Sequence, residues 1–139
     1  MIIAWVLNAL ALAAGALLGA RGFIDPKWAQ KLVRLQPDQQ GGGFAEFRAT
    51  YGAMFAAMHV VALFFTLKWV MGGEYVLGVA AAGASAVIAA GWGGTAIGRA
   101  ISMWRDGART RFNELSTMIE AAMSLAIGGP WLLWLFGLN

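Results

Sequence analysis

The chain has 139 residues, of which 60% are hydrophobic and 12% are charged, whereas soluble domains are roughly half apolar and a quarter charged. This composition excludes an ordinary water-soluble domain and indicates an integral membrane protein. With no cysteine and a single histidine, one chain can form no disulfide, thiol nucleophile or multi-histidine metal site. The net charge of +3 is small and dispersed over short connections, so it does not indicate a nucleic-acid partner.

The charged residues divide the chain into four uncharged runs of 20, 19, 24 and 19 residues. A hydrocarbon core about 30 Å thick needs about 20 helical residues at ~1.5 Å each, so every run is long enough to span it. Barrel strands of about ten residues would alternate apolar and polar positions, and these runs do not. We therefore predict an all-α fold, an integral membrane four-helix bundle that forms a single domain over residues 1–139. The predicted spans cover about 2–20, 44–70, 75–104 and 112–136.

The first span is almost entirely aliphatic, and Asn8, Leu12, Gly15 and Gly19 share one of its faces. Gly15 and Gly19 form a small-xxx-small pair that lets another backbone approach closely, either inside the bundle or at a dimer seam. No basic segment precedes the run, as one would in a signal peptide. We expect it to be retained as a helix.

The first connection, residues 21–43, predicts a short amphipathic helix at the membrane interface. Asp25 before Pro26 is typical of an N-cap followed by a first-turn proline, and Pro37 should end the helix after Gln36. Its bases lie on one side and its apolar residues on another, which suits a helix in the headgroup layer facing anionic lipid. A solvated surface loop is the alternative. Residues 38–43 then form a flexible hinge.

The other three spans carry polar residues at helical spacing. In the second span, one stripe is expected to face inward: Arg48, Gly52, Phe55, His59, Ala62 and Thr66. In the third, Gly91, Gly94 and Gly98 should allow tight packing. In the fourth, one face stacks Asn113, Thr117, Glu120 and Ser124, and Gly128-Gly129-Pro130 is expected to kink the far end.

Charge asymmetry predicts the orientation. Nine of the ten bases lie at the first and third connections, and Lys68 alone lies at the other side. The positive-inside rule then places both termini outside and the basic loops in the cytoplasm, in a bacterial inner membrane.

Several ionisable or polar groups should lie in or near the cytoplasmic half of the bundle. They are Glu46, Arg48, Tyr51, Arg99, Asp106, Glu114 and Glu120. An unpaired charge at the bilayer centre costs at least about 2.5 to 3.5 kcal/mol, and Glu120 lies ~12 Å into its span. We expect Glu120 to pair with Arg48 or Arg99.

Three interpretations of this cluster remain open. It could be a polar lock that fixes helix register, or its arginines could bind the phosphate or carboxylate of a head group. Glu120 and His59 could instead form a proton relay. His59 near mid-membrane is also compatible with a hydrogen-bonded packing residue.

The motif Glu46-Phe47-Arg48-Ala49-Thr50-Tyr51-Gly52, together with Gly98-Arg99 and Asp106-Gly107, resembles an uncharacterised family of small four-helix bacterial membrane proteins. That family is a domain of unknown function and is loosely similar to DoxX-like bundles. The resemblance implies a four-helix bundle in the inner membrane and brings no activity, cofactor or substrate with it.

The sequence therefore favours binding or assembly over catalysis. One hypothesis is a binding protein for an amphiphile such as a phospholipid, quinone or isoprenoid, and a bound lipid or quinone is the only cofactor-like ligand that we consider. A second is an oligomeric or accessory subunit of a larger membrane complex. A proton-coupled carrier or membrane-embedded enzyme using Glu120 and His59 is the alternative, although no nucleophile and base pair, phosphate loop or metal spacing is present. No catalytic residue is assigned.

Overall fold

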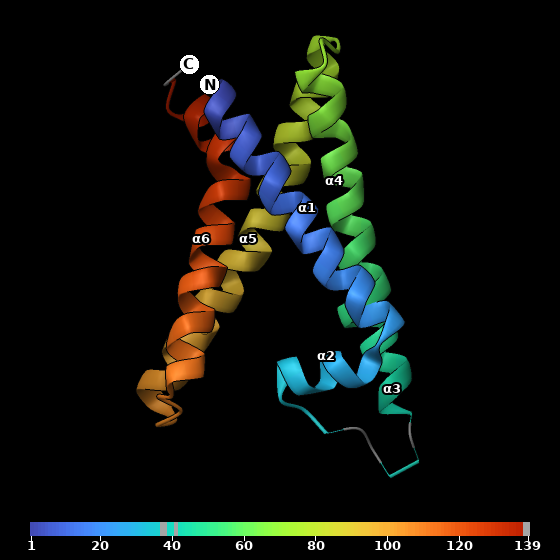
Figure 1. Cartoon of the computed structure of the whole chain (residues 1–139). Helices are drawn as coiled ribbons and strands as arrows, with labels where there is room; N and C mark the ends of the chain where they lie inside the picture. Colours follow the sequence, from blue (N-terminus) through green and yellow to red (C-terminus); the bar gives the residue numbers. More distant parts are fainter. Residues whose placement is uncertain (37–38, 41, 138–139) are drawn as a thin grey trace. The chain divides into compact units, whose positions relative to one another are not determined.

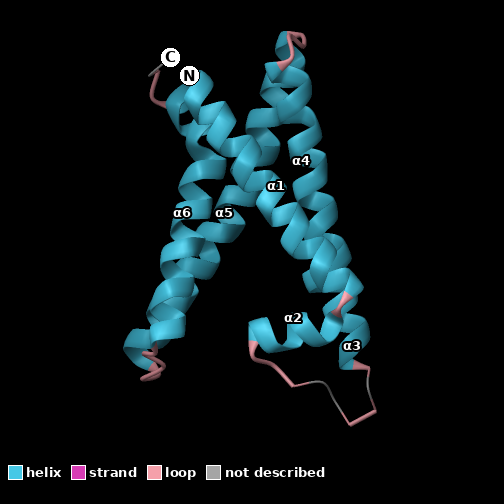
Figure 2. Cartoon of the chain, viewed as in Figure 1, coloured by secondary structure: helices cyan, strands magenta, loops and turns pink. Residues whose placement is uncertain are grey.

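The computed structural model describes residues 1–36, 39–40 and 42–137, and the described chain is all-helical, without strands (Figures 1 and 2). The predicted fold class is confirmed. Its elements are α1 (Ile2–Ile24), α2 (Pro26–Val33), α3 (Gly43–Glu46), the π-helical segment η1 (Phe47–Met54), α4 (Phe55–Val70), α5 (Tyr75–Arg105) and α6 (Arg111–Leu135). Elements α3, η1 and α4 form one continuous helical run, Gly43–Val70, so four helical runs are long and apolar enough to cross a membrane.

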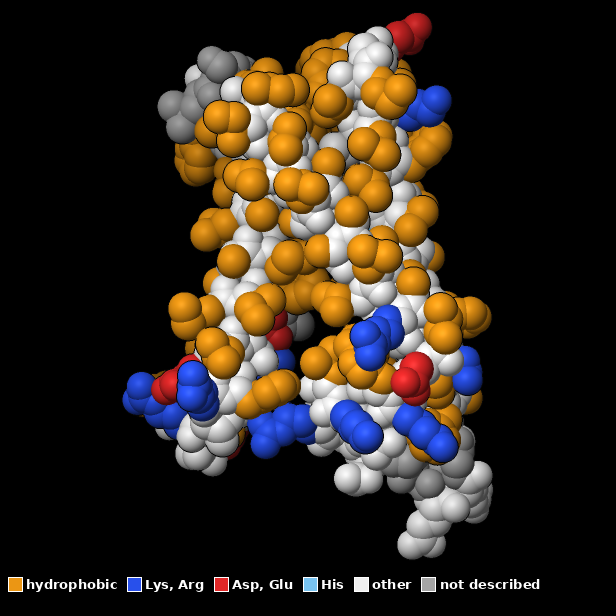
Figure 3. Space-filling model, in the orientation of Figure 1, with side chains coloured by type: hydrophobic (Ala, Val, Ile, Leu, Met, Phe, Trp, Pro, Cys, Tyr) orange, Lys and Arg blue, Asp and Glu red, His pale blue; other side chains and the backbone are white. Residues whose placement is uncertain are grey.

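Large apolar side chains lie mostly on the outside of the helices (Figure 3). Leu10, Leu17 and Val87 are 63%, 71% and 72% exposed, while many of the buried hydrophobic residues are alanines. In a bilayer there is no hydrophobic gain from burying leucine between helices, so small residues fill helix contacts and large ones face lipid. The distribution is that of a protein whose solvent is lipid.

The chain divides into two compact units, and α1 and α4 each contribute residues to both. Unit 1 contains residues 1–11 and 65–139, and unit 2 contains residues 12–64. In unit 1, α5 and α6 run antiparallel and a short turn joins them (Figure 1). Trp5 from α1 is buried against Ala81 and Ala82 of α5. Partly buried aromatic residues surround this core: Phe65, Trp69 and Trp131.

A buried hydrogen-bond network joins the four helices of unit 1 at Asn8. The Asn8 Nδ2 group donates to Ser85 Oγ at 2.9 Å and to the Ile127 carbonyl oxygen at 2.6 Å. Thr66 Oγ1 donates to Asn8 Oδ1 at 2.9 Å. Asn8, Thr66 and Ser85 are fully buried. Because a lone amide in an apolar interior is costly, this network fixes the register of all four helices.

Unit 2 is held by glycines that allow backbones to touch. A Cβ on Gly15 would overlap the His59 imidazole, and a Cβ on Gly19 would lie 2.5 Å from the Ala56 nitrogen. On the other side, a Cβ on Gly52 would lie 2.5 Å from the Phe23 nitrogen. Gly15 and Gly19 are therefore buried inside the unit, as the first of the two alternatives for this pair predicts. In the inward stripe predicted for the second span, Gly52, His59, Ala62 and Thr66 are buried and Phe55 is half-buried. The prediction is wrong for Arg48, which is exposed.

The amphipathic helix α2 begins as predicted, because Asp25 Oδ1 accepts a hydrogen bond from the Trp28 N–H and Pro26 follows the cap. Its predicted end at Gln36 is wrong. The helix stops at Val33 because Arg34 adopts a left-handed conformation with φ 60°, which no α-helix continues. Pro37, Asp38 and Gly41 lie outside the described residues.

Two further boundaries differ from the sequence prediction. Helix α1 continues to Ile24 instead of ending near residue 20, because its last carbonyls receive donors from the Arg48 guanidinium. Residues Phe47–Met54 are π-helical, and such wider turns are usually short bulges inside α-helices. This segment carries Gly52, whose backbone packs against α1.

Replacing Gly19 with alanine should destabilise the protein by about 1 to 3 kcal/mol, because the new methyl group meets the Ala56 backbone, which cannot move aside as a side chain would. Thermal unfolding in a mild detergent measures this loss. Gly129→Ala on α6 is the matched control, since a Cβ there meets only the Ala4 Cβ, at the ordinary contact distance of 3.9 Å. Equal melting temperatures for the two variants would contradict the close contact.

Candidate functional site

Of the two arginines predicted as partners of Glu120, Arg99 forms the pair. Arg99 Nη2 donates to Glu120 Oε1 at 2.6 Å, and Arg99 Nε lies 3.2 and 3.1 Å from Oε1 and Oε2. The Glu120 side chain is 10% exposed and that of Arg99 31%. The guanidinium thus engages both carboxylate oxygens, which is the strongest geometry for such a pair. The pair lets α5 and α6 place two charges within their membrane-spanning runs.

Asn113 extends this pair toward the α5–α6 turn. Arg99 Nη1 lies 3.4 Å from Asn113 Oδ1, and Asn113 Nδ2 donates to the Ala108 carbonyl oxygen at 2.6 Å. The sequence places Asn113 on the same face of α6 as Glu120 but does not predict its contact with Arg99. The cluster of Arg99, Asn113 and Glu120 therefore connects two helices and their turn.

The remaining predicted residues of unit 1 lie apart from this cluster. Glu114 Oε1 accepts from Arg109 Nε at 2.7 Å, and both side chains are largely exposed at 44% and 79%. Asp106 is exposed at the end of α5, where its backbone N–H donates to the Ser102 carbonyl oxygen. Neither acid contacts Arg99 among the described residues.

Glu46, Arg48 and Tyr51 belong to unit 2. The Arg48 Nη1 donates to the Phe23 carbonyl oxygen at 2.5 Å and lies 3.4 Å from that of Ile24. Arg48 therefore caps the end of α1, where a cation also complements the helix dipole. Tyr51 is exposed with its ring 5.8 Å from that of Phe47, and Glu46 is exposed.

His59 is fully buried in unit 2. Its Nδ1 lies 2.7 Å from the Phe55 carbonyl oxygen, which can only accept, so Nδ1 carries the proton. Its ring stacks 4.3 Å from the Phe55 ring and lies over Gly15. These contacts are those of a hydrogen-bonded packing residue. No group of three or more metal-ligating side chains occurs in the described part of the chain.

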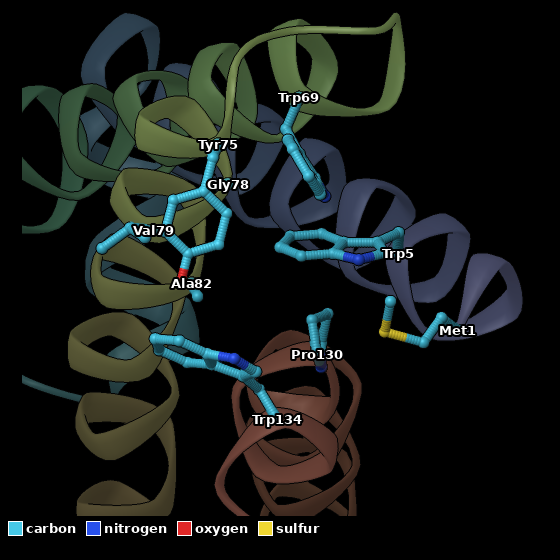
Figure 4. A pocket seen from close by; sticks show the side chains of 9 residues that line it. All are labelled: Met1, Trp5, Trp69, Tyr75, Gly78, Val79, Ala82, Pro130 and Trp134. Atoms are coloured by element: carbon cyan, nitrogen blue, oxygen red, sulfur yellow. The ribbon is translucent and has the colours of Figure 1, made fainter. Parts of the chain in front are cut away.

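An aromatic cavity lies at the start of α5 and the end of α6, at the opposite end of unit 1 from the Arg99 cluster. Figure 4 shows the side chains that line it. Its volume is about 240 Å³, and side chains from α1, α4, α5 and α6 contribute to its walls. The lining residues are Met1, Trp5, Trp69, Tyr75, Gly78, Val79, Ala82, Pro130 and Trp134. Trp5 and Trp69 meet edge to face with their centroids 6.3 Å apart.

Gly78 positions one wall of this cavity. A Cβ on Gly78 would lie 2.9 Å from the Trp69 indole, so the ring lies directly on the α5 backbone. Pro130 forms another part of the wall, within α6, which continues through it to Leu135.

The sequence-based interpretation missed this cavity. Tryptophan and tyrosine at the ends of the predicted spans are typical of residues anchored at the membrane interface. The available signal was that these aromatic residues all fall on the same predicted side of the membrane. Trp5 and Tyr75 lie near the starts of their spans, and Trp69 and Trp134 lie near the ends of theirs. Their convergence on one space depends on helix rotation, which the sequence does not specify.

Comparison with protein-family models, with curated proteins and with solved structures finds no match for this chain. The resemblance to DoxX-like bundles therefore stays a prediction.

Removing one partner of the Arg99–Glu120 pair should cost about 2 kcal/mol or more, because the other charge is then left without its counterion. Arg99→Leu and Glu120→Leu should each lower the melting temperature in detergent. The double variant should be more stable than the sum of the two losses predicts, since it leaves no unpaired charge.

Glu114→Leu is the control for this cycle. Its pair with Arg109 is exposed, so its loss should cost less than about 1 kcal/mol. Strict additivity of the Arg99 and Glu120 substitutions would show that the two side chains do not stabilise one another.

Proposed function

We propose that this chain is an integral protein of a bacterial inner membrane that binds an amphiphile in the aromatic cavity. The observation that carries the proposal is the cavity itself, about 240 Å³ and walled by residues of α1, α4, α5 and α6. A well-formed, mostly apolar pocket lined with aromatic side chains is the usual form of a small-molecule site. Its ligand would be largely apolar.

The arginines are poor candidates for a head-group site, because their guanidinium groups are already engaged. The Arg99 guanidinium donates hydrogen bonds to Glu120 and Asn113, and Arg48 donates to backbone carbonyls. Since Glu120 neutralises Arg99, the pair has little net charge to attract a phosphate. We assign it the role of a polar lock between α5 and α6.

The orientation proposed from charge places the cavity near the outer leaflet. Arg99, Arg105, Arg109 and Arg111 lie around the far end of α5 and the start of α6, which the positive-inside rule assigns to the cytoplasm. The cavity lies at the start of α5 and the end of α6. An amphiphile could then enter sideways from the lipid.

Native mass spectrometry from a mild detergent tests the proposal. The wild-type chain should retain a hydrophobic molecule of defined mass, and Trp134→Ala should reduce its occupancy several-fold because a wall of the cavity is lost. Trp104→Ala is the control, since Trp104 lies at the other end of α5 with 83% exposure. A wild-type spectrum without any added mass, or equal occupancy in both variants, would contradict the cavity site.

Assembly is a second candidate function, favoured by one face of α5. Added Cβ atoms at four of its glycines would meet nothing within 4 Å: Gly83, Gly91, Gly94 and Gly98. Gly94 and Gly98 form a small-xxx-small pair that could receive a helix of another chain.

If α5 packs against another subunit, Gly94→Leu should shift the subunit number measured by native mass spectrometry toward the monomer. Leu125→Ala, on an exposed position of α6, should leave it unchanged. A monomeric wild-type protein would rule out self-association through this face.

A further inference from the structure

Unpartnered hydrogen-bond donors surround the aromatic cavity. Within the described residues, the indole nitrogens of Trp5, Trp69 and Trp134 and the Tyr75 hydroxyl form no hydrogen bond. Tyr75 and Trp134 are 70% and 48% exposed, whereas Trp5 is buried, and a buried tryptophan usually finds a partner for its N–H. Figure 4 shows the nitrogen-bearing edges of the three indoles turned toward the space among the rings.

Trp5 makes this observation specific. The residue is only 8% exposed. In the described part of the chain, every side-chain nitrogen or oxygen atom that is fully buried has a hydrogen-bond partner, whereas the Trp5 nitrogen has none. Its indole N–H is therefore open to a neighbouring space although the ring is buried against Ala81 and Ala82. Trp5 lines the cavity, and Figure 4 shows its nitrogen-bearing edge turned toward it.

The donors define the polarity of a ligand. Each of the three indoles offers a donor and no acceptor, so a ligand needs an atom that accepts hydrogen bonds in order to use them. The cavity lining contains no lysine, arginine, aspartate or glutamate side chain, and the terminal amino group of Met1 is the one basic group among its residues. That group, like the indoles, favours an oxygen atom that accepts hydrogen bonds. An uncharged acceptor, of which the carbonyl oxygen is the common example, meets both conditions.

The volume of the cavity limits the size of the group that it can hold. A dry cavity of about 150 Å³ accommodates benzene, and sites for whole drug-sized ligands begin at about 300 Å³. At about 240 Å³, this cavity can hold one substituted ring or a group of similar size. The remainder of an amphiphile would stay in the lipid.

We propose that the aromatic cavity binds an uncharged carbonyl group together with an adjoining apolar portion of about the volume of one ring, with the Trp5 N–H as a donor to the carbonyl oxygen. This inference rests on the proposed amphiphile-binding function and names the chemistry of its ligand. A carbonyl-bearing ring on an isoprenoid tail and the ester carbonyl of a membrane lipid both supply this group.

A matched pair of probes tests the inference. Duroquinone and durene share a tetramethylated six-membered ring, but only duroquinone carries carbonyl oxygens. Equilibrium dialysis against the full chain in detergent should show duroquinone binding about 10-fold more tightly than durene after correction for partition into empty micelles, as one or two hydrogen bonds would give.

Substitution of single indoles identifies the donor. Trp5→Phe keeps an aromatic ring, removes the N–H and shortens the wall for both probes, so the lost hydrogen bond should weaken duroquinone binding about 3- to 10-fold more than durene binding. Trp104→Phe, at the other end of α5, is the matched control and should change neither. If Trp5→Phe fails to fold, Trp134→Phe, at a half-exposed position, provides the same comparison.

Each outcome decides between the two proposals. Equal affinity for duroquinone and durene would overturn the carbonyl inference while leaving an apolar amphiphile site intact. Binding of neither probe, with no retained mass in the native spectrum, would overturn both. Competition by a short-chain ester phospholipid, but not by its ether analogue, would support the inference and assign the carbonyl to a lipid. If neither the ester phospholipid nor its ether analogue competes, the carbonyl is assigned to a ring-bearing ligand.

Discussion

The hydrogen bonds of Asn8 are the interaction on which the structure of unit 1 depends. Lipid offers no hydrogen-bond partner to a buried amide, so each of its polar atoms must bond to a group on another helix. Asn8 forms hydrogen bonds with Thr66, Ser85 and the Ile127 carbonyl oxygen, which come from α4, α5 and α6. Loss of register in any one of these helices would leave donors or acceptors unpaired in an apolar interior.

The two ends of unit 1 differ in chemistry because of this fixed register. At one end, Arg99 and Glu120 neutralise each other and leave little charge for a ligand. At the other, Trp5, Trp69 and Trp134 line a space to which no charged side chain contributes. The charged end is therefore suited to holding helices together, and the aromatic end is suited to receiving an uncharged molecule.

Glycines have two opposite roles in this chain. Gly19 and Gly78 lie against neighbouring groups that leave no room for a Cβ, so they bring the Ala56 backbone and the Trp69 ring close. Gly91 and Gly94 on α5 face open space, so their small size serves no contact within the described chain. The first role explains how unit 2 and the cavity wall are packed, and the second is the basis of the assembly hypothesis.

The sequence by itself determined the all-α class, the four long apolar helices and the short helix after Asp25, because these follow from hydropathy, charge spacing and local capping. It also indicated that Glu120 needs an arginine, since an unpaired acid at that depth is costly. It could not choose Arg99 over Arg48, end α2 at Val33 or place the π-helical turns of η1. Those features, and the meeting of Trp5 with Trp69 and Trp134 around one cavity, depend on how each helix is rotated and which backbone it touches. Only the tertiary structure decided them, because helix rotation is set by contacts between residues distant in the chain.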